Sequence, residues 1–307
     1  MNPIGAHMSI AGGLAKALER IQAVGGECLQ IFVKPNVQWR AGELSLEEVQ
    51  SFKDRQQQSG ITPVVAHASY LLNLASPEKE LRRRSVLTLA LELVRAARLN
   101  IEFLILHPGS HRESGEKKGL EQIAKGIDQA LDRAEVLQTK ILLETTAGSG
   151  SHLGGRLEHL ENILALSRSI KRLGVCLDTS HVLAAGYNIA DPQGYDEFFR
   201  SFQKLIGLKH LRCVHVNDSK AALGSRVDRH EHIGHGHLGL KTFERLFQDP
   251  RLTGIPFILE TPKGEKEDQD WDYLNIEVLK KLRQAAVPQK GRPHQPGALL
   301  VKNTQKQ

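Results

Sequence analysis

The sequence predicts an α/β protein in which eight parallel strands, each followed by a helix, close into a (β/α)₈ TIM barrel. Three observations lead to this prediction. Short apolar runs alternate with helical patterns through residues 1–283, the length of 307 residues is usual for such a barrel, and most of the runs end in His, Asp or Glu. Side chains at the C-terminal ends of barrel strands converge on one face, so the third observation predicts a site as well as a fold.

The strands are predicted from continuous apolar runs, which are typical of strands buried on both faces of a parallel sheet. We expect strands near residues 4–7, 27–33, 63–67, 102–107, 140–145, 174–178, 211–217 and 256–261. A doubly wound open sheet is the alternative architecture. It would expose sheet edges and would require a topological switch point, which the sequence does not reveal.

The helices are predicted from apolar residues that recur at helical spacing. Ser45 and Glu48 have the form of a capping box, which opens a helix that ends near Gly60. A long amphipathic helix runs from Glu80 to Leu99, and its arginines at 82–84 are expected to form a solvated face. Two further helices each present one apolar face, formed by Leu120, Ile123, Ile127 and Leu131 and by Phe198, Phe199, Phe202 and Leu205.

The net charge of +6 is concentrated at the C-terminal end of the chain. Residues 281–307 contain lysines and arginines but no acidic residue, so the rest of the chain is close to neutral. Residues 284–307 are also rich in Pro, Gly, Lys and Gln, which predicts a basic, flexible tail after a barrel domain of residues 1–283. A neutral body is not by itself a nucleic-acid footprint, although bound cations would make the face around them positive.

The sequence contains no apolar run long enough to span a bilayer and no secretory signal at its start. Its three cysteines, Cys28, Cys176 and Cys213, all lie within apolar runs, where reduced thiols packed in strands are the simplest interpretation. A ligand role stays open for Cys176 and Cys213, since each precedes a candidate metal ligand by two positions. We therefore expect a cytoplasmic protein without a membrane segment.

Histidines and carboxylates cluster at the ends of the predicted strands and in the loops that follow them. The candidate metal ligands are His67, His107, Glu144, Asp178, His181, His215, Asp228, His230 and Glu260. Packed together without cations, Glu144, Asp178 and Glu260 would repel one another and could not all stay ionised. The mixture of imidazole and carboxylate suits zinc or a similar divalent ion. The set is too large for one tetrahedral catalytic zinc but suffices for two or three ions if a carboxylate bridges.

Three sequence blocks carry a resemblance to a known family. HASYLLNLA (67–75), GVCLDTSH (174–181) and HVNDSKAALGSRVDRH (215–230) resemble the signature blocks of endonuclease IV, the zinc-dependent apurinic/apyrimidinic endonucleases. IGAHMSIAGGL (4–14), HPGS (107–110), ETTAGSG (144–150) and GIPFILETP (254–262) are also similar, so the resemblance extends from about residue 3 to about residue 283.

The resemblance implies a TIM barrel with three zinc ions at the C-terminal face. His67, His107 and Glu144 would hold the first zinc, and Glu144 would bridge to a second, completed by Asp178, His215 and Glu260. His181, Asp228 and His230 would hold the third. The implied reaction is hydrolysis of the phosphodiester bond 5′ to an abasic site in double-stranded DNA by a bridging hydroxide, which leaves a 3′-hydroxyl and a 5′-deoxyribose phosphate. Glu144, Asp178 and Glu260 would be the catalytic carboxylates, and the family suggests a monomer.

The DNA-contacting residues are also implied by the resemblance. Tyr70 would insert at the lesion, although it could simply fill its loop, and Asn73 would contact the DNA backbone or satisfy that same loop. Arg226 and Arg229 would meet phosphates or pair with the nearby carboxylates. Where the family reads K-N-x-R-x-W, this chain has Val37 in place of the arginine and Gln38 beside it. The guanidinium's stacking and hydrogen bonds would therefore be lost, which predicts altered damage recognition.

Two other functions are compatible with parts of the pattern. A sugar isomerase or epimerase on a related barrel would need one divalent ion and paired carboxylates, and would leave the Asp178/His181 and Asp228/His230 loop pairs without a role. A lesion-binding protein without catalysis is suggested only by Val37. The number of metal ions per chain distinguishes the first alternative, and an incision assay distinguishes the second.

Overall fold

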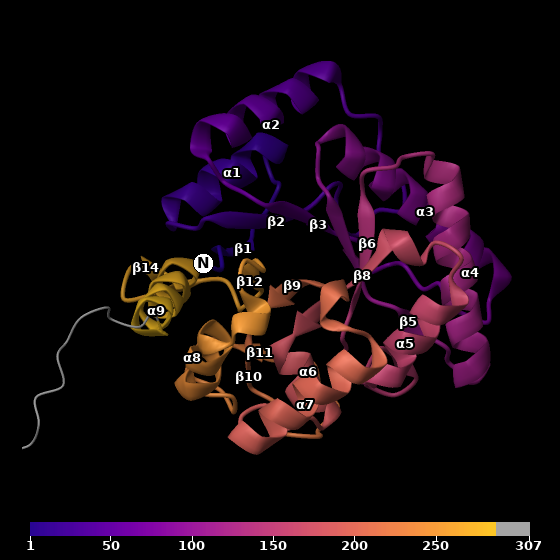
Figure 1. The fold of residues 1–307 in the computed structure, drawn as a ribbon. Coiled ribbons are helices and arrows are strands. Elements are labelled where there is room, and N and C mark those ends of the chain that lie inside the picture. Colours follow the sequence, from indigo (N-terminus) through magenta and orange to yellow (C-terminus); the bar gives the residue numbers. More distant parts are fainter. Residues whose placement is uncertain (287–307) are drawn as a thin grey trace, which may run out of the picture.

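The computed structural model describes residues 1–286 and confirms the predicted barrel (Figure 1). Its strands pair in parallel in the closed order β1-β12-β9-β8-β6-β4-β3-β2. Each falls within or beside one predicted run. The barrel strands are β1 (Ile4–His7), β2 (Cys28–Phe32), β3 (Val64–His67), β4 (Phe103–Leu106), β6 (Lys140–Glu144), β8 (Leu173–Asp178), β9 (Leu211–His215) and β12 (Phe257–Leu259).

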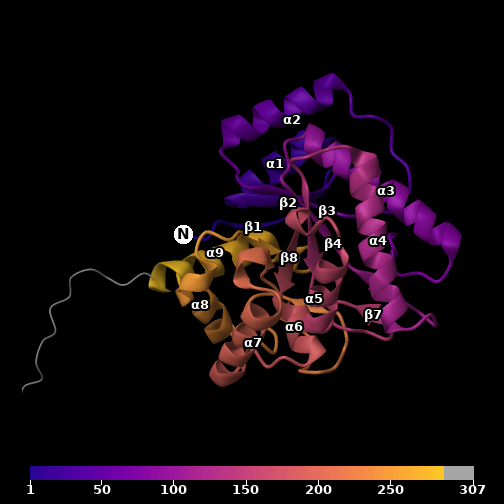
Figure 2. The ribbon, with the colours of Figure 1, turned by 45° about the vertical axis from the view of Figure 1, so that its right-hand side comes forward.

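Helices surround the barrel on its outside, as the two views of the ribbon show (Figures 1 and 2). They are α1 (Leu14–Ala23), α2 (Leu46–Ser59), α3 (Lys79–Arg98), α4 (Glu116–Ala134), α5 (Leu157–Leu166), α6 (Thr179–Ala185), α7 (Pro192–Leu205), α8 (Leu240–Gln248) and α9 (Trp271–Ala286). Short loop elements complete the chain: β5 (Gly109–Ser110), β7 (His152–Leu153), β10 (Asp218–Ser219), β11 (His230–Glu231), β13 (Glu265–Lys266), β14 (Gln269–Asp270), and the 3₁₀ turns η1 (Ile170–Arg172), η2 (Leu208–His210) and η3 (Pro250–Leu252).

The predicted helix signals are confirmed at the level of individual bonds. In α2 the Ser45 hydroxyl accepts from the Glu48 backbone N–H, the Glu48 carboxylate accepts from the Ser45 N–H, and Gly60 ends the helix in the left-handed conformation. The helix expected from Glu80 to Leu99 is α3, within one residue at each end. Arg83 and Arg84 on it are exposed, as expected of a solvated face, whereas Arg82 is half-buried and donates to the backbone oxygen of Ser76.

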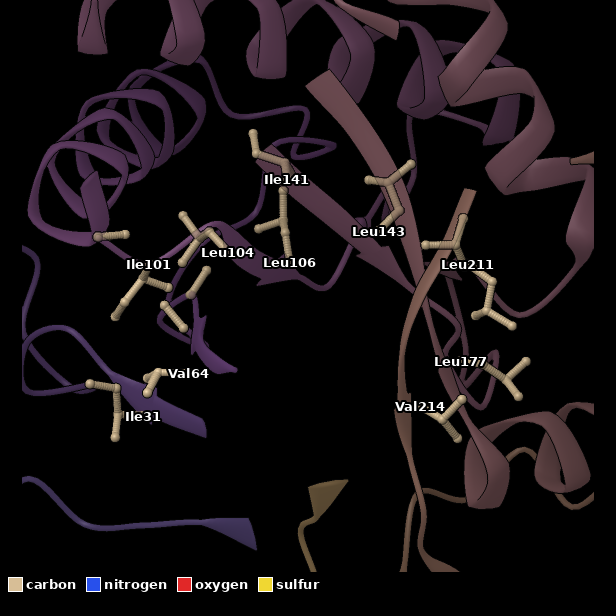
Figure 3. Packing of buried hydrophobic residues seen from close by; sticks show 14 of the residues in the cluster. Ile31, Val64, Ile101, Leu104, Leu106, Ile141, Leu143, Leu177, Leu211 and Val214 are labelled. Atoms are coloured by element: carbon tan, nitrogen blue, oxygen red, sulfur yellow. The ribbon is translucent and has the colours of Figure 1, made fainter. Parts of the chain in front are cut away.

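The alternation of side chains along the strands builds two apolar layers. On β4 and β6, Leu104, Leu106, Ile141 and Leu143 point outward and pack against the helices (Figure 3). The intervening side chains fill the barrel interior together with the cysteines; this inner cluster is Cys28, Val65, Ile105, Leu142, Cys176, Cys213 and Ile258, all 0% exposed. A fully buried aliphatic side chain contributes about 1.5–3 kcal/mol, so both layers stabilise the barrel that carries the site.

The last helix, α9, packs against the start of the chain at β1. Arg283 near the end of α9 donates to the Asn2 backbone oxygen and forms an ion pair with Glu27 at 2.6 Å. The helix continues to Ala286, past the boundary predicted at residue 283. Residues 287–307, which hold most of the predicted tail, lie outside the described residues. Among residues 1–286, no helix combines the length and the apolar character that crossing a membrane requires.

Candidate metal centre

The barrel brings all the candidate ligands to one face. Six of them end a strand or directly follow one: His67 on β3, His107 after β4, Glu144 on β6, Asp178 on β8, His215 on β9 and Glu260 after β12. Because all these strands are parallel, their last residues meet at the same end of the barrel. His181 lies one helical turn after Asp178 on α6, and Asp228 and His230 come from the loop after β9.

Glu144 is the centre of the cluster, and its two carboxylate oxygens face different partners. Oε2 lies 3.1 Å from His67 Nε2 and 2.9 Å from His107 Nε2. Oε1 lies 3.0 Å from His215 Nδ1 and 3.4 Å from His181 Nδ1. Because the two oxygens face separate imidazoles, this carboxylate has the geometry to bridge two ions. The side chain is 0% exposed, so water does not screen its charge.

Possible ligand atoms gather in overlapping groups around Glu144. In each group the atoms lie within 4.8 Å of one another, and the three groups are His67/His107/Glu144, Glu144/Asp178/His215/Glu260 and Asp178/His181/His230. Asp228 joins the last group through Oδ2, 3.1 Å from His181 Nε2, and Oδ1, 3.6 Å from His230 Nε2. Asp178 thus contributes to two groups, which the sequence did not predict. The thiols of Cys176 and Cys213 also lie within this distance of a His215 ring nitrogen, but they belong to the apolar layer below.

The hydrogen bonds of the imidazoles fit a metal-binding role. The Nδ1–H groups of His67, His181 and His230 donate to the backbone oxygens of Ala68, Thr145 and Glu260, respectively. These bonds fix the tautomer and leave each Nε2 lone pair directed into the cluster. Among the described residues, Nε2 of His181 and Nε2 of His230 are buried and have no hydrogen-bond partner. Buried polar atoms normally have one, so these two nitrogens fit the donor set of a cation.

The electrostatics of the cluster balance imidazolium against carboxylate. Burial alone would lower the pKa of His215, but the charges of Glu260 and Glu144 outweigh it and raise this pKa to about 10. Burial alone would raise the pKa of Asp228, but the adjacent imidazole of His181, whose Nε2 lies 3.1 Å from Asp228 Oδ2, outweighs burial and lowers this pKa to about 2. Burial likewise opposes ionisation of Glu144, yet His107 and His215 hold its pKa well below the ordinary value. Glu144 and Asp228 are therefore ionised at neutral pH and available to a cation.

Three residues, Gln30, Asn217 and His7, support the ligands, and two of them, Gln30 and His7, were not predicted from the sequence. Gln30 is fully buried on β2 and accepts from His215 Nε2 at 2.7 Å, and this bond directs His215 Nδ1 toward the carboxylates. The Gln30 amide also donates to Glu260 at 2.5 Å and to His7 Nδ1 at 2.9 Å. Asn217 donates to Asp178 Oδ2 at 2.7 Å. The signals were present, because Gln30 is the polar residue of the run CLQIF and His7 ends its strand as the other histidines do.

A cavity of about 760 Å³ opens over the cluster, and three of the predicted DNA contacts, Tyr70, Asn73 and Arg229, line it. Tyr70 lines it, with 59% of its surface exposed and its ring centroid 5.3 Å from that of His67. Arg229 lines it as well, while the oxygens of the neighbouring Asp228 face His181 and His230. Val37 and Gln38 are exposed on the loop after β2, Val37 to 75%.

Two predicted contacts have local structural partners. The Asn73 amide, also in the cavity wall, accepts from the N–H groups of Ser110 and Ala75 and donates to the Ser110 oxygen, so it joins the loops after β3 and β4. Arg226 lies at a positive φ of 57°, and its backbone oxygen accepts from the Ser149 hydroxyl, while its guanidinium is left for solvent or a ligand. Contact of either side chain with DNA stays a prediction.

Comparison with known proteins gives consistent results. Residues 18–282 match the family model described as a xylose isomerase-like TIM barrel. The chain is 48% identical over 286 residues to a protein of Chloroflexus aurantiacus named probable endonuclease 4, covering 93% of this chain and 100% of that one. It is 44% identical over 279 residues to a protein of the same name from Trichlorobacter lovleyi, covering 91% and 99%.

Solved structures extend the comparison to the fold. A D-tagatose 3-epimerase-like protein has a TM-score of 0.70 at 20% identity, covers 92% of this chain and 98% of its own, and shares the fold alone. The crystal structure of endonuclease IV from Thermus thermophilus has a TM-score of 0.82 at 40% identity and covers 92% of this chain and 99% of its own. With this identity over nearly the whole length of its relatives, the chain belongs to the endonuclease IV family of nucleases.

Proposed function

We propose that this protein is a zinc-dependent DNA-repair endonuclease that hydrolyses the phosphodiester bond 5′ to abasic sites in duplex DNA. The products would be a 3′-hydroxyl and a 5′-deoxyribose phosphate. The observation that carries the proposal is the arrangement of three ligand groups around the two oxygens of Glu144. A single-ion sugar epimerase would have no use for the group of Asp178, His181 and His230.

The proposed metal sites are assigned to residues as follows. His67, His107 and Glu144 would hold one zinc, Glu144, Asp178, His215 and Glu260 a second, and His181, His230 and Asp228 a third. Bound there, zinc would supply a water nucleophile deprotonated near neutral pH and positive charge for the phosphoryl oxygens. The chain's own contribution is to orient the ligands. Gln30 and Asn217 hold His215, Glu260 and Asp178. Backbone carbonyls hold the imidazoles of His67, His181 and His230.

The rim residues would select the damaged nucleotide. Tyr70 stands beside His67 and His107 at the cavity wall, where an inserted ring would occupy the space left by the missing base. An absent base lowers the cost of swinging the sugar and phosphate out of the stack, which is one source of selectivity. Arg226 and Arg229, both exposed, would contact the flanking phosphates.

The direct test is incision of a fluorescent duplex that carries one tetrahydrofuran residue as the abasic analogue. We expect a single nick on the 5′ side of the analogue and extension of the upstream product by a polymerase, which requires a 3′-hydroxyl. An undamaged duplex of the same sequence is the control. Turnover of a ketose sugar with one metal ion per chain and no nick would refute the proposal and favour the epimerase alternative.

Metal binding should release protons between pH 7 and 8. In chelator-treated protein, His215 has a pKa of about 10, compared with about 6.5 in an unfolded chain. Protonation of His215 therefore contributes fully to the stability of the fold below pH 6.5, and this contribution to stability is lost as the pH rises through 10. A cation requires the unprotonated imidazole, so affinity should increase with pH toward 10. Calorimetric titration with zinc in buffers of different ionisation enthalpy measures the released protons. A binding heat that does not depend on the buffer would contradict this prediction.

Substitution of Val37 by arginine should tighten binding to abasic DNA. A planar guanidinium at this exposed position could stack in the duplex, and stacking is worth about 1–3 kcal/mol, so the Kd should fall roughly tenfold. The measurement is fluorescence anisotropy with a duplex whose scissile phosphate is replaced by a phosphorothioate. Val37→Lys is the matched control because it adds the same charge without a planar group. An equal gain in both variants would attribute the effect to charge alone.

A further inference from the structure

One face of α3 is polar although it is covered by the loop after β2. Arg84, Thr88, Glu92 and Arg95 recur at helical spacing, and each contacts that loop. The Arg84 guanidinium lies 4.3 Å from the Trp39 ring centroid, and the Thr88 hydroxyl donates to the Trp39 oxygen. Arg95 donates to the backbone oxygens of Val33 and Gly42. The helix thus holds the loop that carries Val37 and Gln38 along most of its length.

The central contact of this face is a buried ion pair. Glu92 Oε1 lies 3.0 Å from Lys34 Nζ, and both side chains are only 1% exposed. The Lys34 ammonium also donates to the backbone oxygen of Gln38 at 2.5 Å. Burying two charges carries a desolvation cost, so the pair is weak support for a purely stabilising role and invites a positional explanation.

The same carboxylate also binds the neighbouring recognition loop. Both oxygens of Glu92 accept from the Ser69 backbone N–H, at 3.3 and 3.2 Å. The Ser69 hydroxyl in turn donates to the Asn36 oxygen at 2.5 Å. Ser69 lies between the candidate ligand His67 and the exposed Tyr70, and Asn36 directly precedes Val37. One carboxylate therefore joins the two loops that present Val37, Gln38 and Tyr70.

We propose that Glu92 is a positioning residue that fixes the two lesion-contacting loops, residues 34–39 and 69–72, relative to each other and to the metal-ligand cluster. This inference rests on the proposed function, because it assigns the loops to DNA recognition. Loops held in the binding geometry lose little conformational freedom when DNA arrives, so Glu92 would act on affinity rather than on the chemical step. Ser69 carries the alignment to the cluster, since it follows His67 by two residues on the same strand end.

The test is Glu92→Gln, which keeps the shape of the side chain and removes its charge. We expect KM for abasic duplex to rise roughly tenfold, with kcat within about threefold of the unsubstituted protein and with unchanged metal content. Glu102→Gln, which breaks the exposed Lys140–Glu102 pair instead, is the matched control and should change neither constant. A parallel fall in kcat and metal content, or an unchanged KM, would overturn the proposal.

Two additions keep the test decisive. Glu92→Gln leaves the Lys34 ammonium without its carboxylate partner. The double substitution Lys34→Met with Glu92→Leu therefore provides a version without buried charge. The same rise in KM is expected, and a normal KM would refute the positioning role.

In a Trp271→Phe background, Trp39 is the remaining tryptophan of the chain and reports on its loop. Acrylamide should quench it more strongly in the Glu92 variants, and unchanged quenching would also count against the proposal.

The quenching measurement separates this inference from the function itself. Failure of the unsubstituted protein to nick abasic DNA would refute the proposed function. The effect of Glu92 on the loop would still be decided by the fluorescence of Trp39, since that readout does not require incision.

Discussion

Replacement of Glu144 by alanine should abolish incision of abasic DNA and lower the metal content of the protein. The two oxygens of this carboxylate face separate ligand groups, so its removal would deprive two sites of a ligand at once. Metal assistance to phosphoryl transfer is worth several kcal/mol, so the rate should fall roughly 10³-fold or more. The nicking assay gives the rate, and elemental analysis gives the ions per chain.

The matched control for this substitution is Glu80→Ala. Glu80 is an exposed carboxylate on α3 that pairs with Arg83 and belongs to none of the ligand groups. It should leave both measurements unchanged, because exposed ion pairs contribute little. A Glu144→Ala protein that retains full activity and a full metal complement would disprove the bridging role.

Removal of divalent ions by a chelator should eliminate activity and lower the melting temperature. Ions that bind the native state alone stabilise it by about 4 kcal/mol at a free concentration a thousand times Kd, which corresponds to a decrease on the order of 10 °C when they are removed. Within the cluster, Glu144, Asp178 and Glu260 would then be balanced by imidazolium alone. Differential scanning fluorimetry measures the decrease, and zinc added back should restore both properties.

The response of Glu144→Ala to the chelator provides an internal check. Since this variant should already lack ions, its melting temperature should change less than that of the unsubstituted protein. If zinc-free protein, verified by elemental analysis, still nicks abasic DNA and melts at the original temperature, the metal centre is not the basis of its function.

The strand-end ligands could be predicted because a parallel barrel fixes where its strands end. Glu144, Asp178 and His215 are distant in sequence, yet each closes an apolar run, and closure of the sheet alone brings them together. No detail of side-chain packing was needed. The same reasoning places His7 at this face, since it ends β1.

The supporting contacts could not be predicted from the same patterns. The bond from His215 to Gln30 depends on two side chains that meet across the barrel interior, and the pair of Lys34 and Glu92 joins a loop to a helix. Such contacts depend on rotamers and on the path of irregular loops, which leave no periodic signal in the sequence. For Arg84, exposure could be expected, but its position over Trp39 could not.

The apolar layer inside the barrel has a consequence for exchange with the solvent. Cys28, Cys176, Cys213 and their neighbours fill the interior below the ligands without any exposed surface. Ions bound by the ligand set could therefore not pass through the barrel interior, and they would exchange with solvent through the cavity that the DNA would cover. A DNA duplex bound over that cavity would block the dissociation of the ions for as long as it stays bound.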